Sequence, residues 1–300
     1  MTADHSASVL ARLLNRAKAR GEDYNLVLNR FVLERLLYRL SISAHANSFL
    51  LKGAMLFALW YDAPHRPTRD VDLLGFGPDD AETLLTMFRE VFAIDVDDGV
   101  RFDSSSIAIA AIREDNAYGG LRLSIRASIG NARLAAQVDV GFGDAVTPGP
   151  QDVVYPTLLD DFDAPKLRVY PVYTVIAEKF EAMVQLGTAN SRMKDFFDVA
   201  VIARNTELDG ATLARAIQAT FARRGTTVPA EAPTALTVSF AADSSKEKQW
   251  NAFISKSRLA SDSLATVITL LHTLLWPPTR AVADGKHFDL RWTPGSQNWQ

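Results

Sequence analysis

The sequence contains no cysteine among its 300 residues. This absence excludes disulfides, thiolate metal sites and a cysteine nucleophile, and it is compatible with a reducing cytoplasm. Histidine is scarce as well, with five residues that are scattered and never take the His-x-x-x-His spacing of a zinc enzyme. Thiol chemistry is therefore excluded, and a histidine-based metal site has no support.

Long hydrophobic runs are also missing. No window reaches the roughly 18 uninterrupted apolar residues expected of a membrane span, and residues 1–6 lack the basic start and apolar core of a signal peptide. Neither a Gly-x-Ser-x-Gly elbow nor a Walker loop occurs. We expect a cytoplasmic protein with no membrane association.

Charge of one sign is not in excess, since the formal net charge is -3. Any contact with RNA would therefore have to come from a local patch. The basic clusters at 12–20 and 223–224 are candidates, and a solvated helix face is the simpler interpretation of each. The second predicted helix, 25–40, has the same two interpretations for its polar positions: Arg30, Glu34, Arg35 and Arg39.

What is present is a hydrophobic content of 48%, enough for one large or two modest domains. The most informative stretch is Asp70-Val71-Asp72, followed by Leu73-Leu74. On a strand, alternate side chains share a face, so the two acids lie side by side while Val71 faces the core. Paired carboxylates offer the hard oxygen ligands that Mg²⁺ prefers. An isolated Asp-x-Asp can equally be two solvated acids at a strand end.

A second feature, Lys52-Gly53-Ala54, precedes this pair by about the length of a short helix and a loop. Glycine lets the main chain approach a phosphate closely, and the first amides of a following helix can bind that anion. A lone Lys-Gly is usually an ordinary turn. The combination with Asp70-Val71-Asp72, in this order, is more specific than either part.

Together these residues resemble the signature of the polymerase-β-like nucleotidyltransferase superfamily. With residues 66–74 (Arg-Pro-Thr-Arg-Asp-Val-Asp-Leu-Leu) the chain resembles its AbiEii-like branch, which includes the MenT toxins of type IV toxin-antitoxin systems. The superfamily often has Gly-Gly or Gly-Ser where this chain has Gly53-Ala54. The resemblance implies an α+β fold, in which a nucleotidyltransferase core of mixed or antiparallel sheet with flanking helices is followed by a helical C-terminal domain.

A third carboxylate, Asp139, stands in the apolar strand 134–142. An acid among Val and Phe is costly to bury unless it is paired or bound to a metal. The resemblance assigns the third metal-binding acid to Asp139 rather than Asp144. A place on the solvent face of an alternating strand is the other interpretation of Asp139.

The helical half contains Lys179 on one predicted helix and Arg192, Asp195 and Asp198 at the next. From the residues alone, this is an amphipathic helix pair joined by a salt bridge. The spacing resembles the second motif block of the AbiEii-like family. That resemblance implies that Lys179 contacts the triphosphate, that Asp195 organises the site, and that Asp198 is a supporting acid in the nucleotide-binding region.

The domain prediction is a core with N-terminal helices at 1–150, a Pro-rich connection at 151–171, and a mostly helical domain at 172–300 that completes the active site. Turns are expected at 118–120 and 130–131, and no clear period follows Trp276-Pro277-Pro278. The predicted elements are helices over 6–20, 25–40 and 81–92, strands over 100–113, 121–129 and 134–142, and helices over 172–186, 194–204, 211–223, 244–257 and 261–275.

The resemblance implies a mechanism in which two Mg²⁺ ions on Asp70, Asp72 and Asp139 activate a hydroxyl against the α-phosphorus of an NTP. Lys52 and Lys179 would hold the β- and γ-phosphates. The implied acceptor is the 3′ end of tRNA, whose extension blocks aminoacylation and growth, and the implied partner is a cognate antitoxin. As a further hypothesis, phosphorylation of Thr68, two residues before Asp70 in the nucleotide-binding region, would inactivate the enzyme.

Two other functions stay open at this point. The same fold could act on a small-molecule acceptor such as an aminoglycoside, which a net acidic protein with mixed surface charge does not exclude. The chain could also be a non-catalytic interaction protein on a degenerate nucleotidyltransferase fold. Loss of a metal carboxylate would mark that case, and Asp70, Asp72 and Asp139 are all present.

Overall fold

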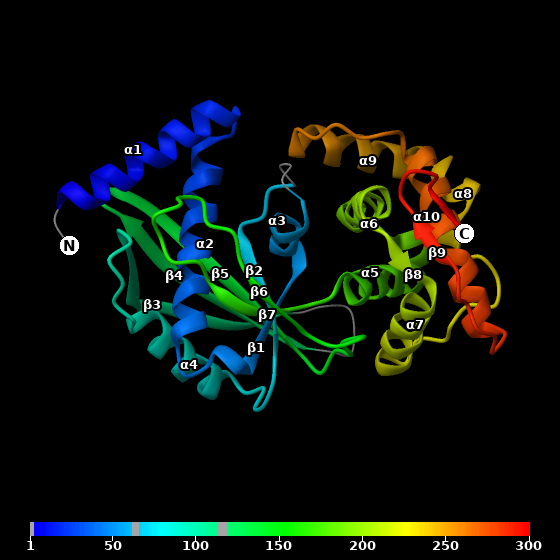
Figure 1. Ribbon diagram of the computed structural model, residues 1–300, viewed down its shortest axis with the longest axis horizontal. Coiled ribbons are helices and arrows are strands. Elements are labelled where there is room, and N and C mark those ends of the chain that lie inside the picture. Colours follow the sequence, from blue (N-terminus) through cyan, green and yellow to red (C-terminus); the bar gives the residue numbers. More distant parts are fainter. Residues whose placement is uncertain (1–2, 62–65, 113–118) are drawn as a thin grey trace. The chain divides into compact units, whose positions relative to one another are not determined.

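The computed structural model describes residues 3–61, 66–112 and 119–300 (Figure 1). The chain separates into two compact units: the first contains residues 1–143 and 151–170, and the second contains residues 144–150 and 171–300. The predicted connection at 151–171 thus falls mostly within the first unit. The reason is that two short strands in this Pro-rich stretch pair with the sheet of that unit.

The first unit is an α+β structure, as predicted. Its elements are α1 (Ala3–Arg20), α2 (Tyr24–Ile42), β1 (Phe49–Lys52), a 3₁₀ turn (Gly53–Leu56), α3 (Phe57–Trp60), β2 (Asp70–Gly75), α4 (Ala81–Ala93), β3 (Val100–Ile112), β4 (Gly120–Ile129), β5 (Ala132–Phe142), β6 (Gln151–Val154) and β7 (Lys166–Val169).

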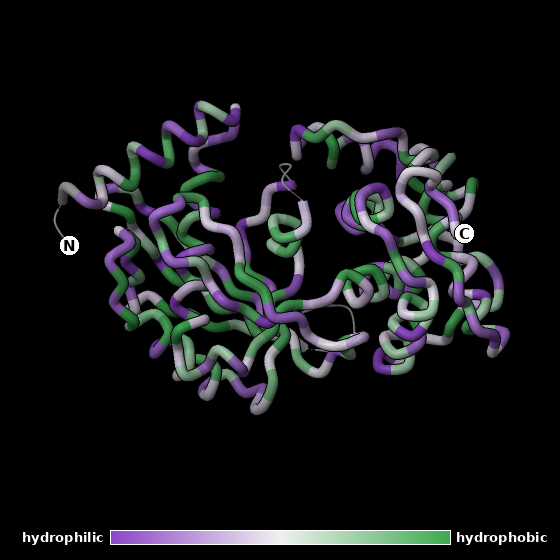
Figure 2. The backbone as a smooth tube through the Cα atoms, viewed as in Figure 1, coloured by the Kyte–Doolittle hydropathy of each residue, from purple (hydrophilic) through white to green (hydrophobic). Residues whose placement is uncertain are grey.

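One mixed sheet organises this unit, with strand order β3-β4-β5-β2-β1-β7-β6. The strands predicted at 100–113, 121–129 and 134–142 correspond to β3, β4 and β5, which pair as an antiparallel meander. Strand β2 runs parallel to β5 and antiparallel to β1. Figure 2 shows hydrophobic residues concentrated along the strands in the middle of this sheet. The sequence prediction missed β1, whose four residues are too few for a periodic signal. The predicted strand end at Arg113 and the turn residue Tyr118 lie outside the described residues.

Helix α2 corrects one expectation about polar positions. Arg35 and Arg39 are 1% and 2% exposed, so they form neither a solvated face nor an RNA-binding surface. Both guanidiniums bond to the buried carboxylate of Asp98, with Nε of Arg35 at 3.0 Å and the terminal nitrogens of Arg39 at 2.6 and 3.1 Å. Buried charges are stable when they are paired in this way, and polarity along a helix does not reveal the pairing.

The second unit is mostly helical, and the helices predicted at 172–186 and 244–257 are confirmed at those bounds. Short strands β8, β9 and β10, which the sequence did not predict, form a small antiparallel sheet. The elements are α5 (Val172–Leu186), α6 (Met193–Asn205), β8 (Leu208–Asp209), α7 (Gly210–Arg224), α8 (Val238–Ala241), α9 (Ser244–Ser257), α10 (Leu264–Ala283), β9 (Arg291–Thr293) and β10 (Asn298–Trp299).

Helix α10 differs most from the prediction, because it begins at Leu264 and continues through Pro277 and Pro278 to Ala283. A proline inside a helix leaves the carbonyl four residues earlier without its donor. Here those carbonyls belong to Thr273 and Leu274, and both accept from the indole Nε1 of Trp299 at 3.1 Å. A distant side chain thus replaces the missing amides, which no local pattern could indicate.

Among the described residues, no helix has the length and apolar character needed to cross a membrane.

Candidate active site

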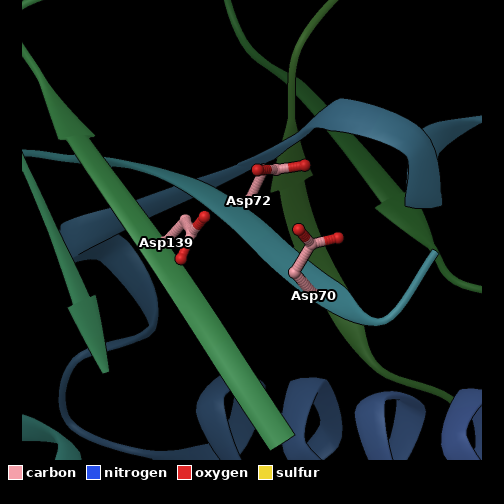
Figure 3. A group of neighbouring side chains, drawn as sticks. All are labelled: Asp70, Asp72 and Asp139. Carbon is pink, nitrogen blue, oxygen red and sulfur yellow. The ribbon is translucent and has the colours of Figure 1, made fainter. Parts of the chain in front are cut away.

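Three carboxylates meet on one face of the sheet of the first unit. In the parallel pairing of β2 and β5, Asp72 lies opposite Asp139 and Asp70 lies opposite Gln137. One oxygen atom from each of Asp70, Asp72 and Asp139 lies within 4.8 Å of the others. Figure 3 shows all three side chains projecting from the same side of β2 and β5. Val71 between them is fully buried, as the alternation predicts.

Gly53 leaves room for the Asp72 carboxylate. It follows β1, where Lys52 lies opposite Asp72, and its φ is +74°. A β-carbon on residue 53 would lie 1.9 Å from Oδ2 of Asp72. Only glycine can take this conformation and leave the carboxylate in place. The predicted turn is present, although a 3₁₀ turn and the four-residue α3 follow it instead of one regular helix.

Thr68 orients the first acid. Its hydroxyl donates to Oδ1 of Asp70 at 2.5 Å. The side chain that the sequence placed near the nucleotide is therefore bonded to a carboxylate of the cluster, which limits the rotamers open to Asp70.

Arg122 on β4 is the residue of this cluster that the sequence analysis missed. Its Nε and a terminal nitrogen donate to the two oxygens of Asp139 at 2.8 and 2.6 Å, and Gln137 adds a donor at 3.3 Å to Oδ1. The hydrogen bonds to Asp139 raise the pKa of the Arg122 guanidinium, and the charges of Asp70 and Asp72 act in the same direction. The turn at 130–131 contained the necessary signal: counting seven residues back from Ile129 and seven forward from Ala132 pairs Arg122 with Asp139.

Charged residues occupy four neighbouring strands of the sheet at this level. Along neighbouring strands the directly opposed residues are Arg122, Asp139, Asp72 and Lys52. The Lys52 ammonium also lies 5.6 Å from the ring centroid of Tyr170. Two acids are thus flanked by two cations on one row, which moderates the repulsion between the acids.

The donor set suits a divalent cation. Its three carboxylates offer the hard oxygen ligands that Mg²⁺ and Mn²⁺ take, and their oxygens converge within one ion's reach. Gly53 itself places no side chain against Oδ2 of Asp72. Asp70, Asp72 and Asp139 could therefore hold a metal.

The second group of predicted residues lies in the second unit and links α5 to α6. Lys179 bonds through Nζ to Asp195 at 2.7 Å and to Asp198 at 2.8 Å. Arg192 bonds through Nε to the other oxygen of Asp195 at 2.7 Å. Both acids are buried, with exposures of 1% and 0%, and the Lys179 side chain is 12% exposed. Burial favours the neutral acid, but the charges of Lys179 and Arg192 outweigh it and lower the pKa of Asp195.

Asp144, the acid that was not chosen as the third metal ligand, belongs to the second unit. It accepts from Arg224 at 3.1 Å, and the same guanidinium bonds to the buried Glu181 at 2.9 Å. Burial lowers the pKa of Arg224, but Glu178, Asp144 and Glu181 more than compensate and raise it. This geometry describes a structural ion-pair cluster.

The family of the chain follows from its similarity to known protein families. A family model described as "Nucleotidyl transferase AbiEii toxin, Type IV TA system" matches residues 35–277. The chain belongs to the AbiEii family. It is a nucleotidyltransferase of the toxin class, and the resemblance expected from the sequence is confirmed.

Two solved structures share the fold of this AbiEii protein. A Helicobacter pylori chain described as a nucleotidyltransferase is 13% identical with a TM-score of 0.51, over 89% of this chain and 100% of that one. JHP933 from the same organism is also 13% identical with a TM-score of 0.50, over 87% and 98%. None of the curated proteins matches the sequence. At this identity the similarity establishes the fold alone.

Proposed function

We propose that this AbiEii nucleotidyltransferase transfers a nucleoside monophosphate from an NTP to the 3′ end of tRNA, using Mg²⁺ held by Asp70, Asp72 and Asp139. The observation that carries the proposal is the convergence of three carboxylate oxygens within 4.8 Å on one sheet face. A bound pair of Mg²⁺ ions would supply charge stabilisation and activation of the acceptor hydroxyl.

Each residue of the acidic cluster then has a defined role. Asp70 and Asp72 present their oxygens from one strand, with Thr68 fixing Asp70 and Gly53 leaving space beside Asp72. Asp139 completes the set from β5. Because these contacts fix the carboxylates before substrate arrives, little reorganisation is needed when it binds.

Binding of the NTP triphosphate requires cationic side chains in addition to the carboxylates that hold the metal. We propose Lys52, on the same row as Asp72, and Lys179, on α5, as ligands of the β- and γ-phosphates. Asp195 and Asp198 bond to Nζ of Lys179 and act as positioning residues for it. The main-chain approach at Gly53 and the hydroxyl of Thr68 would complete the nucleotide contacts.

The toxin class supports tRNA as the acceptor. A toxin must inactivate a component that growth requires, and a modified tRNA 3′ end prevents aminoacylation. We propose that the enzyme acts in the cytoplasm and that a cognate antitoxin restrains it. Phosphorylation of Thr68 would be one form of restraint, because about two negative charges would be placed beside Asp70. Mass spectrometry of fully inhibited toxin tests this point, and an unmodified Thr68 would refute it.

The main experiment incubates the purified protein with total tRNA, Mg²⁺ and each labelled NTP in turn. Asp72→Asn serves as the inactive control, because it keeps the shape of the side chain and removes its charge. We expect label in the tRNA fraction with one or more NTPs for the wild type only. Label in an aminoglycoside but not in tRNA would establish the small-molecule acceptor, and no label with either acceptor would support a degenerate fold.

A further inference from the structure

The feature that the proposed function leaves unexplained is the position of Arg122. Its guanidinium contacts both oxygens of Asp139, at 2.8 and 2.6 Å, and its side chain remains 44% exposed. With Gln137 also donating to Oδ1, that oxygen accepts two hydrogen bonds and Oδ2 accepts one. Most of the lone pairs of this carboxylate are therefore already engaged by the protein.

The electrostatic effect extends to the whole cluster. The Asp139 carboxylate that Arg122 contacts has an oxygen within 4.8 Å of one oxygen each of Asp70 and Asp72. Three carboxylates and one guanidinium make a net charge of -2 where the acids alone would make -3. In a metal-free protein this cation reduces the repulsion among the acids, and it opposes the arrival of any other cation.

We infer that Arg122 is an internal counter-cation of the acidic cluster and competes with the divalent metal ion at Asp139. The inference rests on the proposed function only in its use of Asp139 as a metal ligand. Arg122 would hold the carboxylates in place without metal and would set the metal concentration at which the site fills.

Arg122 could act on metal binding through its charge or by positioning Asp139. These two roles predict opposite effects of an Arg122 substitution on metal affinity. If Arg122 competes through its charge, Arg122→Gln removes the competitor while leaving an amide that can still donate. Arg122→Lys keeps the charge and should bind metal as the wild type does. If Arg122 only positions Asp139, both variants should bind metal more weakly, because the carboxylate would be less well fixed.

Arg126 provides a matched control on the same strand and the same sheet face. Its guanidinium pairs with Asp103 at 2.7 Å, away from the three acids, and it lies opposite Ala135. Arg126→Gln therefore removes the same charge from β4 without altering the contacts of Asp139.

The experiment titrates Mn²⁺ into each purified protein without nucleotide and measures free ion by electron paramagnetic resonance. We expect Arg122→Gln to bind Mn²⁺ about tenfold more tightly than wild type, since a unit charge is removed beside a divalent ion in a partly exposed site. Arg122→Lys and Arg126→Gln should stay within about twofold of wild type, because the first keeps the local charge and the second changes a distant one. Circular dichroism confirms that the variants are folded.

Each other result has a fixed meaning. Unchanged or weaker Mn²⁺ binding by Arg122→Gln, with normal binding by wild type, overturns the inference and leaves the metal-dependent function intact. Tighter binding by Arg126→Gln to the same degree also overturns it, since the effect would then be general surface charge. Absence of Mn²⁺ binding in every variant overturns both the inference and the proposed metal site.

Discussion

Gly53 lies so close to the Asp72 carboxylate that no residue with a β-carbon fits at position 53. A β-carbon on residue 53 would overlap Oδ2 of Asp72, 1.9 Å away, and the backbone of Gly53 has a φ of +74°. The two residues lie at neighbouring ends of β1 and β2, which pair antiparallel. The absence of a side chain at Gly53 is thus required by the position of the Asp72 carboxylate, in addition to any contact that Gly53 makes with phosphate.

Gly53→Ala is expected to remove transferase activity and to weaken Mn²⁺ binding, because the added methyl group must displace the Asp72 carboxylate. Gly77→Ala is the matched control. Gly77 also has positive φ, at +104°, but a β-carbon there meets nothing within 4 Å. Metal titration and labelled-NTP assays of both variants test this relationship, and equal defects in the two would attribute the effect to backbone strain alone.

Lys179→Met is expected to lower the free energy of unfolding of the second unit by about 3–5 kcal/mol, because it removes the cation that contacts two buried carboxylates. Chemical denaturation followed by tryptophan fluorescence measures this loss. Activity should be lost as well, and this variant alone does not separate the two causes.

The triple variant Lys179→Met, Asp195→Asn, Asp198→Asn separates them. Neutral amides no longer require the lysine, so most of the lost stability should return. Activity should stay absent if Lys179 contacts the triphosphate. An active triple variant would reduce Lys179 to a structural residue.

Trp299→Phe is expected to destabilise the second unit by about 1–3 kcal/mol, because the carbonyls of Thr273 and Leu274 lose their donor. The cost should shrink in a Pro277→Ala, Pro278→Ala background, where the new amides can donate to those carbonyls. A double-mutant cycle measured by chemical denaturation gives the coupling. A coupling near zero would show that Trp299 stabilises this end only by packing.

Glu34 should impose a pH dependence on stability. The carboxyl is 2% exposed, and burial raises its pKa from 4.5 to about 7 against the opposing effects of the Leu158 amide and Arg35. Between pH 4.5 and 7 the folded protein keeps a proton that the unfolded chain has lost, so stability falls as pH rises through this range.

Glu34→Gln removes this contribution while keeping an oxygen for the Leu158 amide. The stability of the variant relative to wild type should therefore increase by up to about 3 kcal/mol from pH 4.5 to pH 7.5. Denaturation curves at several pH values provide the measurement. A difference that does not vary with pH would mean that Glu34 titrates alike in the folded and unfolded states.

Prediction succeeded where the information was local. The Asp70-Val71-Asp72 alternation placed two acids on one face, and the helix predicted at 81–92 is α4 (Ala81–Ala93). It failed where a partner far along the chain decides the outcome. The charged residues of α2 gave no sign of Asp98, and the two prolines of α10 gave no sign of Trp299.

The features of the candidate site divide in the same way into local ones and ones that depend on distant parts of the chain. The sequence alone determined which residue types are available: two acids at strand spacing, a third acid in an apolar strand, and a glycine before a short helix. These depend on side-chain chemistry and on the two-residue period of a strand. Only the tertiary structure decided that β2 pairs with β5 in the register that sets Asp72 opposite Asp139. Register between distant strands depends on how the whole sheet buries its apolar face, which no single stretch of sequence contains.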